Sequence, residues 1–143
     1  MKKTLILIIG LVVAGISATC AQSNEGTITL KVRVEGIIKG KGNLEISVFD
    51  SENTWLESPI KKRVIDLAEV EHNEFEITGI AKGNYGISVV QDENKNGEID
   101  MGFMGPEEGY GFSNNPNSMF GPAPFKKAVM AIQEDKSITI RLN

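Results

Sequence analysis

Cysteine and histidine are almost absent from this 143-residue sequence, which contains one of each. The cysteine, Cys20, lies near the N-terminus, so the chain that follows it has no thiol for a disulfide or for nucleophilic catalysis. The histidine, His72, stands in the polar run EHNE, which predicts a solvated turn, and one histidine cannot form a zinc cluster. We therefore predict no catalytic residues and no enzymatic activity, because a serine hydrolase would have to recruit His72 as its base.

Long apolar runs are also scarce, and the one that stands out lies at residues 5–14. Two lysines precede it and small residues follow at positions 18, 19 and 21, which is the layout of a secretory signal peptide. The run is shorter than the roughly 20 residues that span a bilayer. We predict a signal peptide at residues 1–21, a mature chain without a transmembrane span, and an extracytoplasmic location, either periplasmic or secreted. A lipid anchor on Cys20 is the alternative, although the residues before it match a lipobox only in part.

Basic residues are outnumbered by acidic ones. Without Lys2 and Lys3, the remaining chain has 13 basic and 19 acidic residues. Such a surface does not favour nucleic acid or anionic lipid, because both depend on basic patches for binding. Residues 22–143 contain no internal repeat or low-complexity linker, and their number suits one core. We predict a single domain over residues 22–143 that does not bind nucleic acid.

Strict alternation of apolar and polar residues is what the sequence does contain. Ile28, Leu30, Val32 and Val34 alternate with polar neighbours, which is the period of a half-buried strand. Six further segments are interpreted as strands: 44–48, 64–67, 74–78, 85–91, 128–132 and 137–142. We therefore predict an all-β fold, an antiparallel seven-stranded β-sandwich of transthyretin-like or immunoglobulin-like type. A closed barrel is the alternative.

Residues 101–126 fit neither a strand nor a helix, because they contain five glycines and four prolines. The segment is longer than most loops, and such loops are functional or disordered. Its aromatic residues argue for order, because disordered segments are poor in them. We predict one long Gly/Pro-rich loop that packs in an ordered way over one end of the sandwich.

Two stretches carry resemblances to known families. The run FEITGIAKGNYGISVV, Phe75 to Val90, resembles the strand-turn-strand of transthyretin-like and carboxypeptidase-regulatory-like sandwiches. The run DENKNGEIDMGFMGPEEGYGFSNNPNSMFGPAPFKKA, Asp92 to Ala128, is similar to the bacterial extracytoplasmic family catalogued as domain of unknown function 2141. The specific marks are the Asp/Asn/Gly turn, then EGYGFSNN, then FGP with a phenylalanine before the next strand. The resemblance implies a secreted sandwich and assigns no activity.

The stretch DENKNGEID, residues 92–100, places oxygen-bearing side chains at alternate positions around Gly97. Calcium loops of the D-x-[DN]-x-[DN]-G type share this spacing, because ligands project from alternate positions and the glycine permits a sharp turn. We predict calcium as a cofactor, with Glu98 contributing its backbone carbonyl. The predicted metal ligands are Asp92, Asn94, Asn96, Glu98 and Asp100.

The stretch differs from a helix-loop-helix calcium site at the twelfth position of the loop. A bidentate glutamate occupies that position in such sites, and this sequence has Phe103 there. Glu107 or Glu108, carried back by the glycine-rich loop, would have to supply the missing carboxylate. The alternative is a turn closed by its own side chains, since Asn-Gly is a strong turn pair.

A second candidate site combines aromatic rings with amides, a mixture suited to gripping a sugar or a peptide. Its residues are Tyr110, Phe112, Asn114 and Asn115. The alternative is that the two aromatic residues are plugs that hold the long loop onto the sandwich. Trp55 leaves the same choice between a ligand platform and a loop anchor.

These patterns predict a secreted, non-catalytic β-sandwich module that binds a ligand or assists another protein of the bacterial cell envelope, with calcium as a stabiliser. Its expected partner is an envelope protein or a glycan. The alternatives are a hydrolytic enzyme of the envelope and a purely structural envelope component.

Overall fold

The computed structural model describes residues 26–117 and 121–143. The predicted signal peptide, including Cys20, lies outside the described residues. The fold is all-β, as predicted, and its strands are β1 (Thr27–Glu35), β2 (Asn43–Phe49), β3 (Lys61–Asp66), β4 (Glu74–Ala81), β5 (Gly83–Asp92), β6 (Met101–Gly102), β7 (Gly105–Pro106), β8 (Tyr110–Phe112), β9 (Met130–Ile132) and β10 (Lys136–Arg141). The helical segments are short: η1 (Glu52–Thr54), η2 (Leu67–Glu69) and α1 (Phe125–Ala128). None of the described helices is long and apolar enough to cross a membrane.

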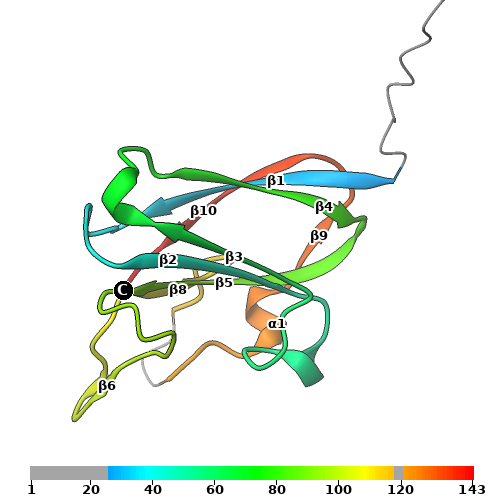
Figure 1. Ribbon diagram of the computed structural model, residues 1–143. Helices are drawn as coiled ribbons and strands as arrows, with labels where there is room; N and C mark the ends of the chain where they lie inside the picture. The colour runs from blue at the N-terminus through cyan, green and yellow to red at the C-terminus, as the bar shows by residue number, and fades with distance from the viewer. Residues whose placement is uncertain (1–25, 118–120) are drawn as a thin grey trace, which may run out of the picture.

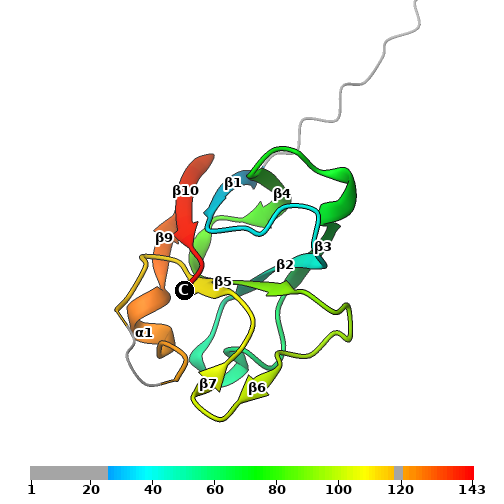
Figure 2. The ribbon, with the colours of Figure 1, turned by 90° about the vertical axis from the view of Figure 1, so that its left-hand side faces the viewer.

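Two sheets form the two layers of the domain (Figure 1). The first sheet has the order β10-β1-β4, and the second has the order β3-β2-β5-β8, with β9 paired to the start of β5. The β6–β7 hairpin and α1 lie beyond the second sheet, on the side away from the first (Figure 2). The outer face of the second sheet is therefore partly covered by other parts of the chain.

The main core lies between the two sheets and follows from the alternation in the sequence. Leu30 and Val32 of β1 point inward and are fully buried, as are Ile46 of β2 and Ile87 of β5. Burying an aliphatic side chain of this size contributes about 1.5–3 kcal/mol. The polar residues that alternate with them consequently face outward on each sheet.

The observed strands differ from the predicted set in number and in one pairing. The seven predicted segments correspond to β1, β2, β3, β4, β5, β9 and β10, and the structure adds β6, β7 and β8 inside the 101–126 segment. The expected antiparallel arrangement holds for every described pair except β1 with β10, which run parallel. A parallel pair needs a long connection, and nearly the whole domain separates these two strands.

Candidate functional site

The outer face of the second sheet carries small and aromatic side chains where the first sheet carries charges. Alternation along β2 turns Ser47 and Phe49 outward, because their neighbours Ile46 and Val48 enter the core. The register of the sheet places Ser47 opposite Ser88 of β5. In turn, Ser88 lies opposite Phe112 of β8, and Val90 lies opposite Tyr110. These three strands therefore form a continuous outer surface with few charges.

An aromatic cluster packs on this surface and forms a second, smaller core. Trp55 contacts Phe49, with ring centroids 5.0 Å apart, and Phe112 at 5.7 Å. Phe125 of α1 packs against the same indole at 5.5 Å. The indole N–H of Trp55 donates to the carbonyl oxygen of Ala123 at 2.8 Å. Trp55 is therefore a loop anchor, which ties the segment before α1 to the sheet.

An apolar groove of about 460 Å³ opens beside this cluster. Its floor is the outer surface of β2, β5 and β8, and its walls come from the loop after η1, the 97–106 segment and the loop before α1. The lining residues include Glu45, Ser47, Phe49, Glu57, Lys62, Ser88, Val90, Gly97, Ile99, Met101, Pro106, Tyr110 and Phe112. The volume lies in the range of small-molecule sites, which are concave and mostly apolar with a few polar groups.

Three charged side chains also line this groove: Glu45 on β2, Glu57 in the loop after η1, and Lys62 on β3. Lys62 Nζ lies 2.7 Å from a carboxylate oxygen of Glu45, and Glu57 is exposed. The only histidine, His72, packs against Phe75 with ring centroids 5.3 Å apart, and Phe75 belongs to the core between the sheets. His72 does not line the groove.

The β6–β7 hairpin beside the groove exposes apolar side chains. Phe103 and Met104 at its tip are almost fully exposed, and Met101 is largely exposed. Figure 2 shows the hairpin projecting from the second sheet. Met101 and Pro106, at the base of the hairpin, line the groove. The groove and the hairpin thus form one continuous apolar region.

The segment predicted to bind calcium, residues 92–100, is a tight loop held by its own side chains. Asp92 is buried at the end of β5, and its carboxylate accepts from the backbone N–H of Asn96 at 3.2 Å and of Gly97 at 2.8 Å. Asn94 Oδ1 accepts from the N–H of Asn96, and Asn96 Oδ1 accepts from the N–H of Glu98. Gly97 has a φ of +80°, which glycine adopts without strain.

The structure brings the predicted ligands Asp92, Asn94, Asn96 and Asp100 into this one loop. The side-chain amides of Asn94 and Asn96 both donate to the carboxylate of Asp100, at 2.5 and 3.1 Å. The role predicted for Glu98 was a carbonyl contact, and the structure records its N–H as a donor to Asn96. Gly97 and Ile99 line the groove, so the loop borders the apolar region.

Glu108 closes the loop from outside by hydrogen bonds to its backbone, while the role predicted for Glu107 or Glu108 as a calcium ligand stays a prediction. Its buried carboxylate accepts from the N–H of Glu93 at 2.8 Å with one oxygen and from the N–H of Asp100 at 3.2 Å with the other. The two ends of the loop are therefore held together by one side chain from the segment before β8.

The donor set of the loop fits calcium by its chemistry, because it consists of oxygen atoms. Within the described residues, no group of three or more His, Cys, Asp or Glu side chains is placed to hold a metal ion. A cation here would therefore depend on amide and backbone oxygens as well as on Asp92 and Asp100. Since the NH₂ groups of Asn94 and Asn96 face Asp100, both amides would have to turn before their oxygens could join it.

A lysine ties the same loop to the end of β3. Lys95 Nζ donates to Asp66 Oδ2 at 2.7 Å, and the N–H of Ala68 donates to the other carboxylate oxygen at 3.0 Å. The hydrogen bond from Lys95, followed by that from Ala68, holds the pKa of Asp66 below its usual value. The pair is exposed and contributes little to stability.

The predicted ligand surface divides into two parts in the structure. Tyr110 and Phe112 line the groove, whereas Asn114 and Asn115 hold backbone together. The amide of Asn114 donates to the carbonyl oxygens of Lys127, Ala128 and Val129, at the end of α1. Asn115 donates to Thr139 and accepts from the N–H of Arg141, so it pairs with β10.

Ser113, which precedes these asparagines, fills the gap between β8 and β9 along the edge of β5. Its hydroxyl accepts from the N–H of Ile87 at 2.9 Å and donates to the carbonyl oxygen of Ala128 at 2.6 Å. Ser113 is fully buried. The run Ser113–Asn115 therefore fastens the end of the long segment to both sheets.

Sequence reasoning identified Tyr110 and Phe112 but missed the two serines of the groove floor and the exposed hairpin. The triplet Ile-Ser-Val occurs twice, at residues 46–48 and 87–89, and each copy turns one serine outward between two core residues. This repeat is the signal that could have identified Ser47 and Ser88. Only the pairing register shows that the two serines face each other.

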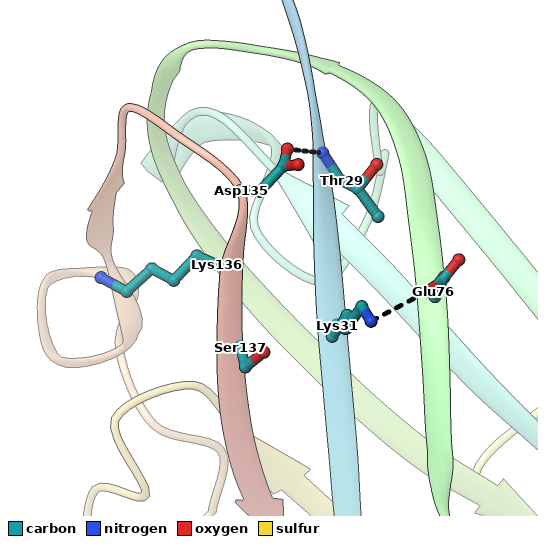
Figure 3. A pocket seen from close by; sticks show the side chains of 6 residues that line it. All are labelled: Thr29, Lys31, Glu76, Asp135, Lys136 and Ser137. Atoms are coloured by element: carbon teal, nitrogen blue, oxygen red, sulfur yellow. Dashed lines mark hydrogen bonds and ion pairs between the residues drawn. The ribbon is translucent and has the colours of Figure 1, made fainter.

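A second, polar pocket lies on the outer side of the first sheet (Figure 3). Its volume is about 310 Å³. Asp135 accepts there from the backbone N–H of Thr29 at 2.7 Å, and Lys31 pairs with Glu76 at 3.3 Å. Asp135, Lys31 and Glu76 are already engaged by other groups of this pocket, so it is a weaker candidate than the groove.

Comparison with known proteins places the chain in a family. The sequence matches the model of the family described as "Uncharacterized protein conserved in bacteria" over residues 32–141, which include the second sheet, the groove and all of the first sheet except the start of β1. No curated protein and no solved structure matches the chain. The match spans most of the chain, and the protein therefore belongs to this bacterial family, domain of unknown function 2141.

Proposed function

We propose that this protein is an extracytoplasmic, non-catalytic binding or accessory module of the bacterial cell envelope, and that it binds through the apolar groove. The groove itself is the observation that carries the proposal. Concave, mostly apolar clefts of this volume are the usual form of small-molecule binding sites. The exposed side chains of Phe103 and Met104 beside it support the same conclusion.

An apolar ligand suits the groove better than a glycan. Most of the lining is apolar and includes aromatic rings, Val90 and proline, so the few polar side chains of the groove could bond only some of the hydroxyl groups of a sugar. The amides of Asn114 and Asn115, which would serve a glycan, bind backbone atoms instead. The proposed partner is therefore an envelope protein or other envelope component that presents an apolar group.

The arrangement of titratable groups supports a binding role over hydrolysis. A serine nucleophile on the groove floor would need a general base, and His72 packs elsewhere. Glu45 is the carboxylate nearest in sequence to Ser47, and it already forms an ion pair with Lys62.

A neutral hydrophobic dye tests the binding proposal. The purified exported protein should enhance the fluorescence of N-phenyl-1-naphthylamine in a saturable way, because the dye gains an apolar environment in the groove. Ser47→Leu should fill the floor and lower the dye affinity at least tenfold. The matched control is Thr29→Leu, which makes a similar change beside the polar pocket of the other sheet and should bind as the parent does. Equal affinities of the two variants, both with parental melting temperatures, would refute the groove as the site.

The proposed location depends on the N-terminal segment. Because a charged start, an apolar run and small residues follow in the order of a signal peptide, we expect a mature chain that begins at Gln22. Mass spectrometry of the exported protein measures this directly. A lipid-modified Cys20 at the N-terminus would instead make the protein a membrane-anchored lipoprotein.

Calcium binding by residues 92–100 is a second proposal. The carboxylates of Asp92 and Asp100 approach the same turn, and a cation between them would relieve their mutual repulsion. Since Gly97 and Ile99 line the groove, a bound cation would also steady one wall of the binding surface. Calcium acts here as a stabiliser rather than as a catalyst.

A further inference from the structure

Two serine hydroxyls on the floor of the groove have no hydrogen-bond partner among the residues that the structure describes. Ser47 and Ser88 are 9% and 6% exposed and face each other across β2 and β5. Both line the groove, and neither hydroxyl forms a hydrogen bond with a residue of the described ranges. The other buried polar side chains of these ranges all form such bonds within the protein; they are Gln91, Asp92, Glu108 and Ser113. The two exceptions therefore both belong to the groove.

An unpartnered hydroxyl that is nine-tenths buried indicates a missing partner, because protein interiors rarely leave such groups without a hydrogen bond. Water can supply that bond while the groove is open. A ligand that brings its own polar atom to the serine pair can replace this water without loss. A purely apolar ligand cannot, and it would leave both hydroxyls without a bond.

The charged side chains near the serine pair favour a neutral polar group on the ligand over an anionic one. Lys62 lies opposite Ser47 in the register of β2 and β3, and its ammonium group is already paired with Glu45. Glu57 adds a further negative charge at the groove. An anionic group on the floor would thus be buried without a free counter-charge, which is costly. A neutral group would meet no such cost.

We propose that the groove binds a neutral amphipathic molecule, whose apolar body lies against Phe49 and Phe112 and whose hydrogen-bonding end, of the alcohol or amide type, contacts the Ser47–Ser88 pair. This inference rests on the proposed binding function of the groove and extends it to the chemical class of the ligand. The ligand is recognised by two features at once, an apolar length and a single neutral polar end.

Three eight-carbon probes separate these features: 1-octanol, octanoate and octane. Trp55 is the only tryptophan and contacts Phe49 and Phe112, so its fluorescence reports occupancy of the groove without a label. The purified exported protein should bind 1-octanol roughly tenfold more tightly than octane or octanoate. Ser47→Ala combined with Ser88→Ala should lower the affinity for 1-octanol about tenfold and leave that for octane unchanged. The control Ser137→Ala, in the polar pocket of the other sheet, should match the parent.

Two kinds of failure can be told apart. If 1-octanol and octane bind equally, or if the double variant binds 1-octanol as the parent does, the ligand class is wrong and the groove remains a binding site. If none of the three probes binds and the naphthylamine dye does not bind either, the proposed function itself is wrong. The melting temperature of the double variant, expected at or above that of the parent, excludes unfolding as the cause of any loss.

Discussion

The outer faces of the two sheets differ although both are built from the same alternating pattern. On the first sheet the outward side chains are charged and paired, as in Lys31 with Glu76 and Arg33 with Glu74. On the second sheet the outward side chains of β2, β5 and β8 are mostly serine, valine and aromatic residues, and a second small core covers part of them. The charged side chains of the first face are well solvated by water. The mostly apolar side chains of the second face are more stable when other segments or a ligand cover them.

The chain itself supplies most of that cover after β5. The 92–100 loop, the β6–β7 hairpin and the segment before α1 all follow this strand in the sequence, and each contributes to the groove. They cover the second face only in part, and the groove is what remains open. We therefore expect ligand binding in the groove, which the covering segments leave open. A comparison of variants on the outer faces of the two sheets can test this expectation.

The largest expected difference between the faces concerns stability. Replacing Phe112 with Ala should lower the free energy of unfolding by about 3–5 kcal/mol, because it removes a buried ring from the second core. The comparison variant Lys31→Ala removes a half-exposed charge from the first face and should cost less than about 0.5 kcal/mol. Chemical denaturation measures both. A loss below about 1 kcal/mol for Phe112→Ala would show that the second core does not stabilise the domain.

Replacing two different serines of the second sheet with alanine should have different effects on stability. Ser113→Ala should cost about 1–3 kcal/mol, because it leaves the N–H of Ile87 and the carbonyl oxygen of Ala128 without their bonds to the hydroxyl. Ser88→Ala removes a hydroxyl that has no partner among the described residues and should change stability by less than about 0.5 kcal/mol or raise it. Thermal melts of the two variants decide the matter. A larger loss for Ser88→Ala than for Ser113→Ala would contradict the assignment of Ser88 to ligand binding.

Calcium should stabilise the segment beside the second face, and not the first face, if the 92–100 loop binds it. At a concentration ten times the dissociation constant, calcium would stabilise the folded state by about 1.4 kcal/mol. Calcium sites of extracellular modules have dissociation constants of roughly 10⁻⁴ to 10⁻³ M. With a similar affinity here, millimolar calcium should raise the melting temperature, and magnesium should do so less. Asp100→Asn keeps the size of the side chain and should abolish the effect. Identical melting curves in calcium and in chelator, at equal ionic strength, would leave the loop as a turn closed by its own hydrogen bonds.

The smallest expected effect lies on the first face. Lys31 and Glu76 are 47% and 53% exposed, and their coupling energy in a double-mutant cycle should be about 0.2–1 kcal/mol. Added salt should weaken it, because exposed charges are screened. A coupling above about 2 kcal/mol that resists salt would mean that the charged face also contributes a specific, partly buried interaction.

The local alternation of apolar and polar residues predicted most of the strands. It did not predict the three shortest strands that follow β5 or the groove on the outer face of the second sheet. Alternation identified the segments that became β1, β2, β5 and β10, because a strand buried on one face must alternate. The same reasoning passed over β6, β7 and β8, because two or three residues rich in glycine and proline show no period. The 92–100 loop was identified as a tight Asp/Asn/Gly turn, and its use of calcium stays a prediction.

The sequence by itself determined the fold class, the inward-facing residues and the turn at Gly97, since these depend on the period of a strand and on the backbone freedom of glycine. Tertiary structure alone decided that β1 and β10 pair in parallel, that Glu108 closes a loop fifteen residues before it, and that Ser47 meets Ser88. The physical reason is separation along the chain. Alternation specifies which side of a strand a residue occupies, whereas only the packing and register of distant strands specify which residue it meets there.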